Sequence, residues 1–227
     1  TEHRPRRHGF EPAQRRRILE GADRADAIID YLAATDIRMY RISSDLAPYV
    51  THPDLPQFHQ QIDECADELA QLGAKARSLG IRLSFHPSQF ILLNSPDPAL
   101  VAKSVQDLAA QARMLDAMGL GSEAVVVTHV GGVYGDLASG RERWALAWEQ
   151  LPELVRRRLV LEHDDTRFDT ADVLWIQART GVRLVFDYLH HWCLNRAGLD
   201  PHEALARCLA TWPAEQTPKI HFSSPRT

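Results

Sequence analysis

Hydrophobic residues recur along this chain at two alternating spacings. Between residues 11 and 36 the apolar side chains stand three or four positions apart, which is the spacing of a helix with one buried face; they are Ile18, Ala22, Ala25, Ile29 and Leu32. The next segment, IRMYRIS at 37–43, predicts a strand. A second helical pattern covers 60–80 and ends at Gly80, as a helix with a C-cap glycine does.

The same alternation continues to the end of the sequence. Further helices are predicted at about 98–118, 141–158, 170–180 and 201–211, and further strands at 81–85, 124–128, 159–162, 182–186 and 219–222. The runs AVVV and LVL are apolar without alternation, which is typical of parallel strands covered by helices on both faces. Six strands and six helices therefore predict an α/β fold. No low-complexity linker divides the chain, so residues 1–227 are expected to form one domain.

Composition adds little to this prediction. The chain has 227 residues, of which 44% are hydrophobic and 25% charged, the profile of a globular domain with a substantial core. The net charge of -4 neither favours nor excludes nucleic acid, because a local basic surface matters more than the total. One charge run is consistent with a solvated, exposed terminus or with phosphate contacts; it comprises Arg4, Arg6, Arg7, Arg15, Arg16 and Arg17.

Cysteine usage and hydropathy bear on the compartment. Cys65, Cys193 and Cys208 are odd in number and have no CxxC spacing. No apolar run approaches the ~18 residues that a membrane helix needs, and no signal-peptide pattern is present. A reducing cytoplasm is therefore the expected location.

Residue types that bind metals stand where the predicted strands end. The first strand ends with Arg41 and Ser43, and the other five end with His86, with His129, with Glu162 and Asp164, with Asp187, His190 and His191, and with His221. A single histidine at a strand end is more often structural. In a (β/α) barrel, however, the carboxyl ends of all strands converge on one face. The joint pattern therefore predicts a metal site.

The predicted ligands are nitrogen and oxygen atoms without thiolate, which suits zinc, manganese or iron. A carboxylate such as Glu162 or Asp187 can bridge two ions roughly 3.5–4 Å apart, an arrangement that stabilises in-line phosphoryl displacement. Hydrolysis by a serine or cysteine nucleophile has weaker support, because the sequence has no GxSxG motif and its cysteines lie in helical or loop segments.

Six segments together resemble the UV damage endonuclease family: YRISSDLAPYVTHP (40–53), FHPSQFILLNSP (85–96), VVTHVGGVYGD (126–136), LVLEHDD (159–165), VFDYLHHWCLN (185–195) and PKIHFSSPR (218–226). The resemblance covers nearly the whole chain in order. It implies a TIM (β/α)8-type barrel, of the same superfamily as metal-dependent AP endonucleases and xylose-isomerase-like sugar enzymes. It also implies a DNA repair enzyme of the nucleoid that nicks double-stranded DNA 5′ to pyrimidine photoproducts, and often to abasic sites, in a form of nucleotide excision.

The resemblance also implies roles for individual residues. Two or three divalent ions, commonly manganese with zinc, magnesium or cobalt as alternatives, would be bound by His86, His129, Glu162, Asp187, His190 and His221. Glu162 would bridge them. Lys219 would lie beside them as a charge partner for phosphate, unless it is an ordinary strand-end lysine.

Four further residues match positions that contact DNA in the family. Gln89 and Phe90 match a polar and aromatic pair that is inserted at the lesion. The family usually has tyrosine at the second position, so Phe90 keeps the stacking face and loses a hydroxyl. Arg41 and Asn94 are candidates for contacts with the DNA backbone.

The number of predicted strands departs from the family. A closed barrel has eight strands and typically about 250 residues. The family has a strand before the first helix, and after the PKIHFSS strand it has a further histidine and a final strand that ends in a glutamate ligand. The expectation is therefore a barrel that lacks its first and last strands, is marginally stable, binds metal more weakly and is completed by another segment or a partner chain.

Two alternatives stay open at this point. One is a metal-dependent sugar isomerase or epimerase on the same barrel. The other is a truncated, non-catalytic protein that binds damaged DNA. HPSQF followed by LNSP suits a loop that probes a duplex rather than one that encloses a small polyol. Metal-dependent turnover would separate an endonuclease from a binding protein.

Overall fold

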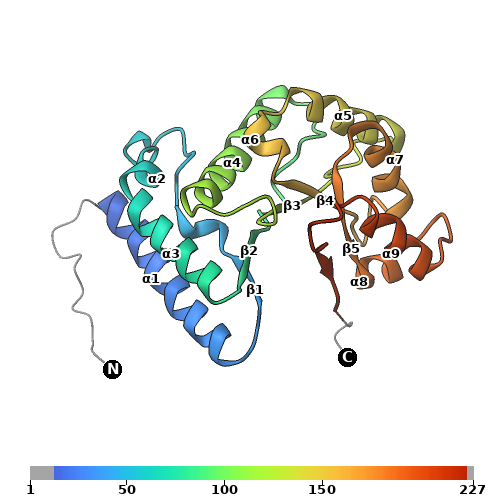
Figure 1. The fold of residues 1–227 in the computed structure, drawn as a ribbon. Coiled ribbons are helices and arrows are strands. Elements are labelled where there is room, and N and C mark those ends of the chain that lie inside the picture. The colour runs from blue at the N-terminus through green and yellow to red at the C-terminus, as the bar shows by residue number, and fades with distance from the viewer. Residues whose placement is uncertain (1–12, 224–227) are drawn as a thin grey trace.

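The sheet is parallel and curled, and its strand order follows the sequence. A computed structural model describes residues 13–223, and within them six strands pair in the order β1-β2-β3-β4-β5-β6. They are β1 (Met39–Ile42), β2 (Arg82–Phe85), β3 (Val126–His129), β4 (Leu159–Glu162), β5 (Arg183–Asp187) and β6 (Ile220–His221). Figure 1 shows them on the inside of an arch whose outer surface is made of helices. The predicted α/β barrel type is thus confirmed, as a half-barrel.

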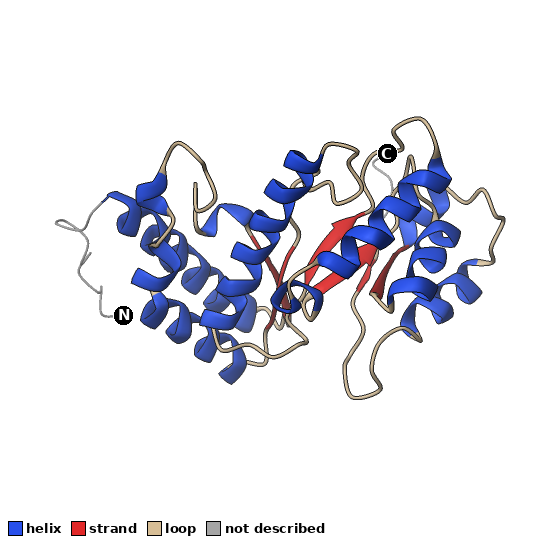
Figure 2. Ribbon diagram, turned by 90° about the horizontal axis from the view of Figure 1, so that it is seen from above, coloured by secondary structure: helices blue, strands red, loops and turns tan. Residues whose placement is uncertain are grey.

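Helices connect the strands and cover the convex face of the sheet (Figure 2). They are α1 (Ala13–Ala34), α2 (Gln61–Glu64), α3 (Ala66–Ser78), α4 (Pro98–Ala117), α5 (Leu137–Gln150), α6 (Glu153–Arg156), α7 (Thr170–Thr180), α8 (Tyr188–Cys193) and α9 (Pro201–Leu209), with short 3-10 turns η1 (Ser44–Leu46) and η2 (Pro56–Phe58). Residues 11–12 of the first predicted helix, and Arg4, Arg6 and Arg7 of the charge run, lie outside the described residues.

Two predicted helices are each divided in the structure. The helix expected at 60–80 breaks at Cys65, whose φ of -117° and ψ of 24° leave the helical region. The helix expected at 141–158 ends at Gln150, and a separate turn of helix follows Pro152. Proline has no N–H to continue the helical hydrogen bonds. The six-residue helix α8 was not predicted.

Apolar side chains pack on both faces of the sheet. The larger cluster lies between the strands and the helices. A smaller cluster contains Val127, Val160, Val185 and Trp212. These valines stand two positions before His129, Glu162 and Asp187, so they face the same, concave side of the sheet as those residues. They form an apolar layer inside the half-barrel, next to the carboxyl ends of the strands.

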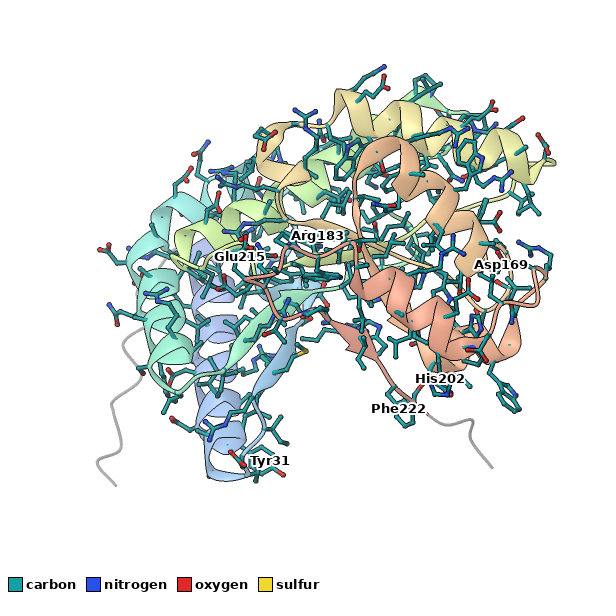
Figure 3. All side chains as sticks on the ribbon, turned by 45° about the vertical axis from the view of Figure 1, so that its right-hand side comes forward. Tyr31, Asp169, Arg183, His202, Glu215 and Phe222 are labelled. Carbon is teal, nitrogen blue, oxygen red and sulfur yellow. The ribbon has the colours of Figure 1, made fainter. Side chains whose placement is uncertain are left out.

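Two arginines pack against Trp212 of this smaller cluster, on the side of the amino ends of the strands. The guanidinium groups of Arg82 and Arg183 lie 5.5 and 5.0 Å from the centre of the Trp212 ring. Arg183 also donates to the carbonyl of Ser122 at 3.0 Å and to the side chain of Gln216 at 2.7 Å. Figure 3 labels Arg183 near the segment that carries Glu215. These contacts fix the α9–β6 loop against the amino ends of the strands.

The two edges of the half-barrel lie at β1 and β6. Among residues 13–223, β1 pairs only with β2 and β6 only with β5. Figure 1 shows the arch open between these two strands. In the same described range, no helix combines the length and the apolar character that crossing a membrane requires.

Candidate metal centre

Glu162, the last residue of β4, is the centre of the candidate site. Its side chain is only 1% exposed, and both of its carboxylate oxygens face histidines. Oε1 lies 2.7 Å from His221 Nδ1 and 3.6 Å from His190 Nδ1. Oε2 lies 3.0 Å from His86 Nε2 and 3.7 Å from His129 Nε2. One buried carboxylate thus meets histidines from four other elements or loops.

Asp187 contributes a second carboxylate from the end of β5. Its Oδ1 accepts a hydrogen bond from the backbone N–H of His190 at 2.9 Å, which caps α8. Its Oδ2 lies 4.0 Å from His190 Nε2 and 3.8 Å from His221 Nδ1. The cap explains why α8 begins directly after the strand and why His190 turns back toward the site.

These side chains form two groups that could each hold a metal ion. One consists of His86, His129 and Glu162, and the other of Glu162, Asp187 and His190. Within each group the candidate ligand atoms lie within 4.8 Å of one another. Glu162 belongs to both groups, and so it stands where a bridging carboxylate would.

The proton positions of two histidines test whether these residues fit a cation. His86 Nδ1 lies 3.3 Å from the carbonyl of Pro87, and His190 Nδ1 lies 3.0 Å from the carbonyl of His163. A carbonyl oxygen can only accept, so a hydrogen bond in each contact requires a proton on Nδ1. A ring whose only proton is on Nδ1 has its lone pair on Nε2, which lies on the side of a carboxylate oxygen. A cation between that nitrogen and that oxygen would satisfy both acceptors, and mixed nitrogen and oxygen donors suit a divalent one.

The charges in the cluster shift the pKa values of its members. Burial raises the pKa of Glu162, but hydrogen bonds with His221 and His86 and the charges of His221 and His129 together lower it well below its usual value. Burial is also the main reason why the pKa of His129 is lowered, and nearby His86 and His190 lower it further. A lowered pKa favours the carboxylate form of Glu162 and the uncharged ring of His129, the forms in which each can bind a metal.

Lys219 lies inside the half-barrel close to this cluster. It is buried, and its Nζ donates to Ser84 Oγ of β2 at 2.7 Å. Burial, with the charges of Arg82 and Arg41, lowers the pKa of Lys219 to about 8, although Glu162 opposes the shift. Arg41 itself is exposed at the end of β1. The structure therefore places Lys219 beside the predicted ligands, with Arg41 at the rim.

The β2–α4 loop carries the pair matched to lesion binding. Gln89 and Phe90 are both exposed, and the Phe90 side chain is 70% exposed. Gln89 lines a cavity of about 210 Å³ whose wall also contains His129, His190 and Arg167. A larger hollow of about 990 Å³ lies between α1 and β1 and contains none of the candidate ligands. The smaller cavity therefore joins the loop to the metal groups.

The structure does not bring Asn94 to the surface. Asn94 is fully buried, and its Nδ2 donates to the carbonyl of Gly132 at 2.7 Å. This bond ties the β2–α4 loop to the β3–α5 loop. The placement does not support the expected contact with a DNA backbone and instead makes Asn94 a link between the two loops.

Two residues beside the cluster were not singled out from the sequence. Arg167 is exposed in the β4–α7 loop, lines the smaller cavity and has no acidic side-chain partner among residues 13–223. His163 is fully buried, and burial lowers its pKa to about 3. The segment HDDTR contains aspartates, which favour turns because their side chains can accept hydrogen bonds from N–H groups a few residues later. In the structure Asp164 accepts such bonds from Thr166 and Phe168. Those aspartates could have marked Arg167 as a loop residue presented at the strand ends.

Known proteins resemble this chain in sequence and in fold. The UV DNA damage endonuclease of Bacillus velezensis is 35% identical over 200 residues, which is 88% of this chain and 62% of that protein. The enzyme of the same name from Bacillus pumilus is 35% identical over 193 residues, or 85% of this chain and 60% of that protein. The chain thus spans about three-fifths of the length of these curated relatives.

Solved structures resemble this chain either in both sequence and fold or in fold alone. The crystal structure of SacUVDE is 30% identical, with a TM-score of 0.83, and covers 95% of this chain and 73% of that one. The structure of a D-psicose 3-epimerase has a TM-score of 0.61 at 13% identity, and the match covers 87% of this chain and 66% of the epimerase chain. The structure of endonuclease IV from Thermus thermophilus has a TM-score of 0.57 at 19% identity, and the match covers 87% of this chain and 70% of the endonuclease chain. At such low identity they show the shared barrel fold alone.

A family model provides the assignment. The model described as UV-endonuclease UvdE matches residues 21–227, which is most of the chain and includes every candidate ligand described above. Together with relatives above 30% identity, this match establishes that the chain belongs to the UV-endonuclease UvdE family.

Proposed function

We propose that this chain carries the active site of a metal-dependent endonuclease that nicks UV-damaged DNA 5′ to pyrimidine photoproducts and also acts at abasic sites. The observation that carries the proposal is the meeting of five side chains from the carboxyl-end side of the sheet around the buried carboxylate of Glu162. Membership of the UvdE family supports it. We further propose that residues 1–227 act as one domain.

Each candidate ligand has a place in the proposed metal centre. Glu162 would bind ions on both sides, with His86 and His129 on one side and Asp187, His190 and His221 on the other. Divalent ions, when bound, would supply a water of lowered pKa and positive charge for the phosphate oxygens. The donor set of imidazole and carboxylate without thiolate supports manganese, in two or three sites.

Basic side chains around the cluster would hold the phosphodiester. Lys219 would offer positive charge from inside the half-barrel, held in place by its hydrogen bond to Ser84. Arg41 and Arg167 are exposed at the strand ends, where they would contact the backbone on either side of the cleaved bond. Each such contact adds affinity that falls with salt and carries no sequence information.

The β2–α4 loop would recognise the damage. Phe90 exposes most of its ring to water, and an unstacked base would cover that ring by stacking. Gln89 next to it lines the cavity that leads to His129 and His190. A protruding aromatic side chain of this kind favours a distorted duplex over a small polyol, and so it weighs against the sugar isomerase alternative.

Strand cleavage tests the proposal. An end-labelled duplex with one defined pyrimidine photoproduct would be incubated with this chain and Mn²⁺, beside an undamaged duplex and beside the Glu162→Gln variant. We expect a nick immediately 5′ to the photoproduct that requires metal and is absent with the variant.

Two results would contradict the proposal. Binding of the damaged duplex without cleavage at saturating Mn²⁺ would leave a non-catalytic binding protein. Cleavage that does not distinguish the two duplexes would contradict the role of the β2–α4 loop. An abasic-site duplex in a parallel reaction tests the second substrate.

A further inference from the structure

We propose that His163 is a positioning residue that aligns Asp187 and His190 for metal binding. The inference rests on the metal centre of the proposed function and adds a residue to it. His163 follows Glu162 at the end of β4 and is fully buried. It therefore lies next in sequence to one candidate ligand and, as its contacts indicate, beside two others in space.

His163 contacts both neighbouring ligands through different atoms. Its ring Nε2 accepts a hydrogen bond from the backbone N–H of Asp187 at 3.1 Å. Its backbone carbonyl lies 3.0 Å from His190 Nδ1. The first contact fixes the end of β5, where the Asp187 carboxylate starts, and the second fixes the ring of His190. One residue directly after β4 thus sets the placement of two candidate ligands from the next strand and its helix.

These contacts also determine which nitrogens carry protons. The Asp187 N–H can only donate, so His163 Nε2 has the lone pair and its proton sits on Nδ1. The His163 carbonyl can only accept, so His190 carries its proton on Nδ1. His190 Nε2 is then free to bind an ion, 4.0 Å from Asp187 Oδ2. The His163 carbonyl belongs to the backbone and is kept by any substitution, so a change of the side chain acts through the Asp187 N–H. Removal of an outer-shell partner of a metal ligand typically changes metal affinity about 10- to 100-fold.

Aromatic neighbours hold the His163 ring in place. It packs edgewise against His190 and His191, with ring centres 6.0 and 6.2 Å apart and interplanar angles of 82° and 83°. Phe186 lies on another side at 5.3 Å. Phenylalanine in place of His163 would retain this packing and remove only the acceptor, whereas glutamine would retain an acceptor and lose the ring.

Metal affinity and proton positions provide the test. Mn²⁺ binding would be measured by calorimetry for the wild type, His163→Phe, His163→Gln and Ile29→Val, the last as a control for a small loss of stability far from the site. We expect the dissociation constant to rise about 10- to 100-fold in His163→Phe. In His163→Gln it should stay within about threefold of the wild type, and in Ile29→Val it should not change.

Nuclear magnetic resonance of the metal-free protein gives a second readout that a role in packing alone would not affect. We expect protons on Nδ1 of both His163 and His190, and a changed amide shift for Asp187 in His163→Phe but not in Ile29→Val. Protons on Nε2 of either ring would overturn the inference. If His163→Phe does not fold, this measurement on the wild type decides the question.

The outcomes separate this inference from the proposed function. Equal Mn²⁺ affinity in the wild type and His163→Phe would overturn the positioning role alone. Absence of Mn²⁺ binding by the wild type would overturn the proposed metal centre and this inference together.

Discussion

Four histidines surround the carboxylate of Glu162, and each of them has a ring nitrogen near one of its charged oxygens. Because that charge faces both metal groups, its removal should affect both at once. Glu162→Gln retains the shape of the side chain, and we expect Mn²⁺ affinity to fall by more than about 100-fold, beyond the effect of an outer-shell residue. Glu162→Ala should abolish binding and nicking.

Calorimetry with Mn²⁺ measures this effect, and Glu149→Gln, at an exposed position of α5, is the matched control. Retained cleavage by Glu162→Ala would contradict the bridging role. Unchanged affinity in Glu162→Gln would contradict binding through the carboxylate.

We expect Gln89 to act in substrate recognition and not in metal binding. Its side chain is exposed at the cavity, and it is absent from both metal groups. We therefore expect Gln89→Ala to retain Mn²⁺ affinity but to reduce the preference for a damaged duplex by at least about tenfold, since one base contact is worth ~1–3 kcal/mol.

The ratio of cleavage rates on damaged and undamaged duplexes measures this preference. Gln150→Ala, the same substitution at an exposed position of α5 outside this cavity, is the control. An unchanged ratio, or a loss of metal from the variant, would contradict the proposed role of Gln89.

The sequence indicated the ligands better than the residues that hold them. His86, His129 and Glu162 could be singled out as candidates that lie together because parallel strands end on one face, so residues far apart in sequence converge by a simple rule. The burial of Asn94 and the contacts of His163 follow from partners on other elements, the carbonyl of Gly132 and the N–H of Asp187. No spacing along the chain encodes such a partner.

The elements show the same division between what a pattern can and cannot predict. All six strands were predicted, most readily β3, β4 and β5, whose apolar runs are buried on both faces of the sheet. The break at Cys65 was not, because apolar residues keep helical spacing on both sides of it. Pro152 could have marked the second break. Helix α8 is shorter than two turns, so it has too few residues to show a period.

A close approach between two helices gives a prediction at this scale. Gly73 of α3 lies against the end of α4, and a Cβ at this position would be 1.9 Å from the carbonyl oxygen of Met118. Backbone atoms must move to relieve that overlap. We therefore expect Gly73→Ala to reduce the free energy of unfolding by about 3 kcal/mol, the upper part of the range for overpacking.

Gly80→Ala is the matched comparison. Gly80 has a φ of +65° with no atom near the added methyl group, so its cost is conformational and about 1 kcal/mol. Urea unfolding of the two variants would separate the effects. Equal losses would contradict a steric role for Gly73.

At the scale of the whole molecule, the metal groups join strands that are separated by helices along the chain. The candidate ligands come from the ends of β2, β3, β4, β5 and β6 and from α8, which follows β5. The site therefore exists only when the curled sheet is assembled. Metal that binds the folded form in this way should stabilise the entire assembly.

Thermal unfolding tests this linkage. At a Mn²⁺ concentration 100 times the dissociation constant, stabilisation is about 2.7 kcal/mol, and we expect the midpoint to rise by about 5–10 °C. The Glu162→Gln variant should show no rise, and excess chelator should reverse it. Binding without a rise, or a separate transition for each half of the sheet, would contradict assembly as one unit.

The order of strands in the sheet also bears on synthesis. Because the strands follow one another in sequence, a chain leaving the ribosome completes His86, His129 and Glu162 first. His221, which meets Glu162 Oε1, follows 59 residues later. At about 5–20 residues per second this interval is roughly 3–12 seconds. Translation therefore completes the His86, His129 and Glu162 group while the facing group still lacks His221, and the assembled sheet that both groups require can form only after this interval.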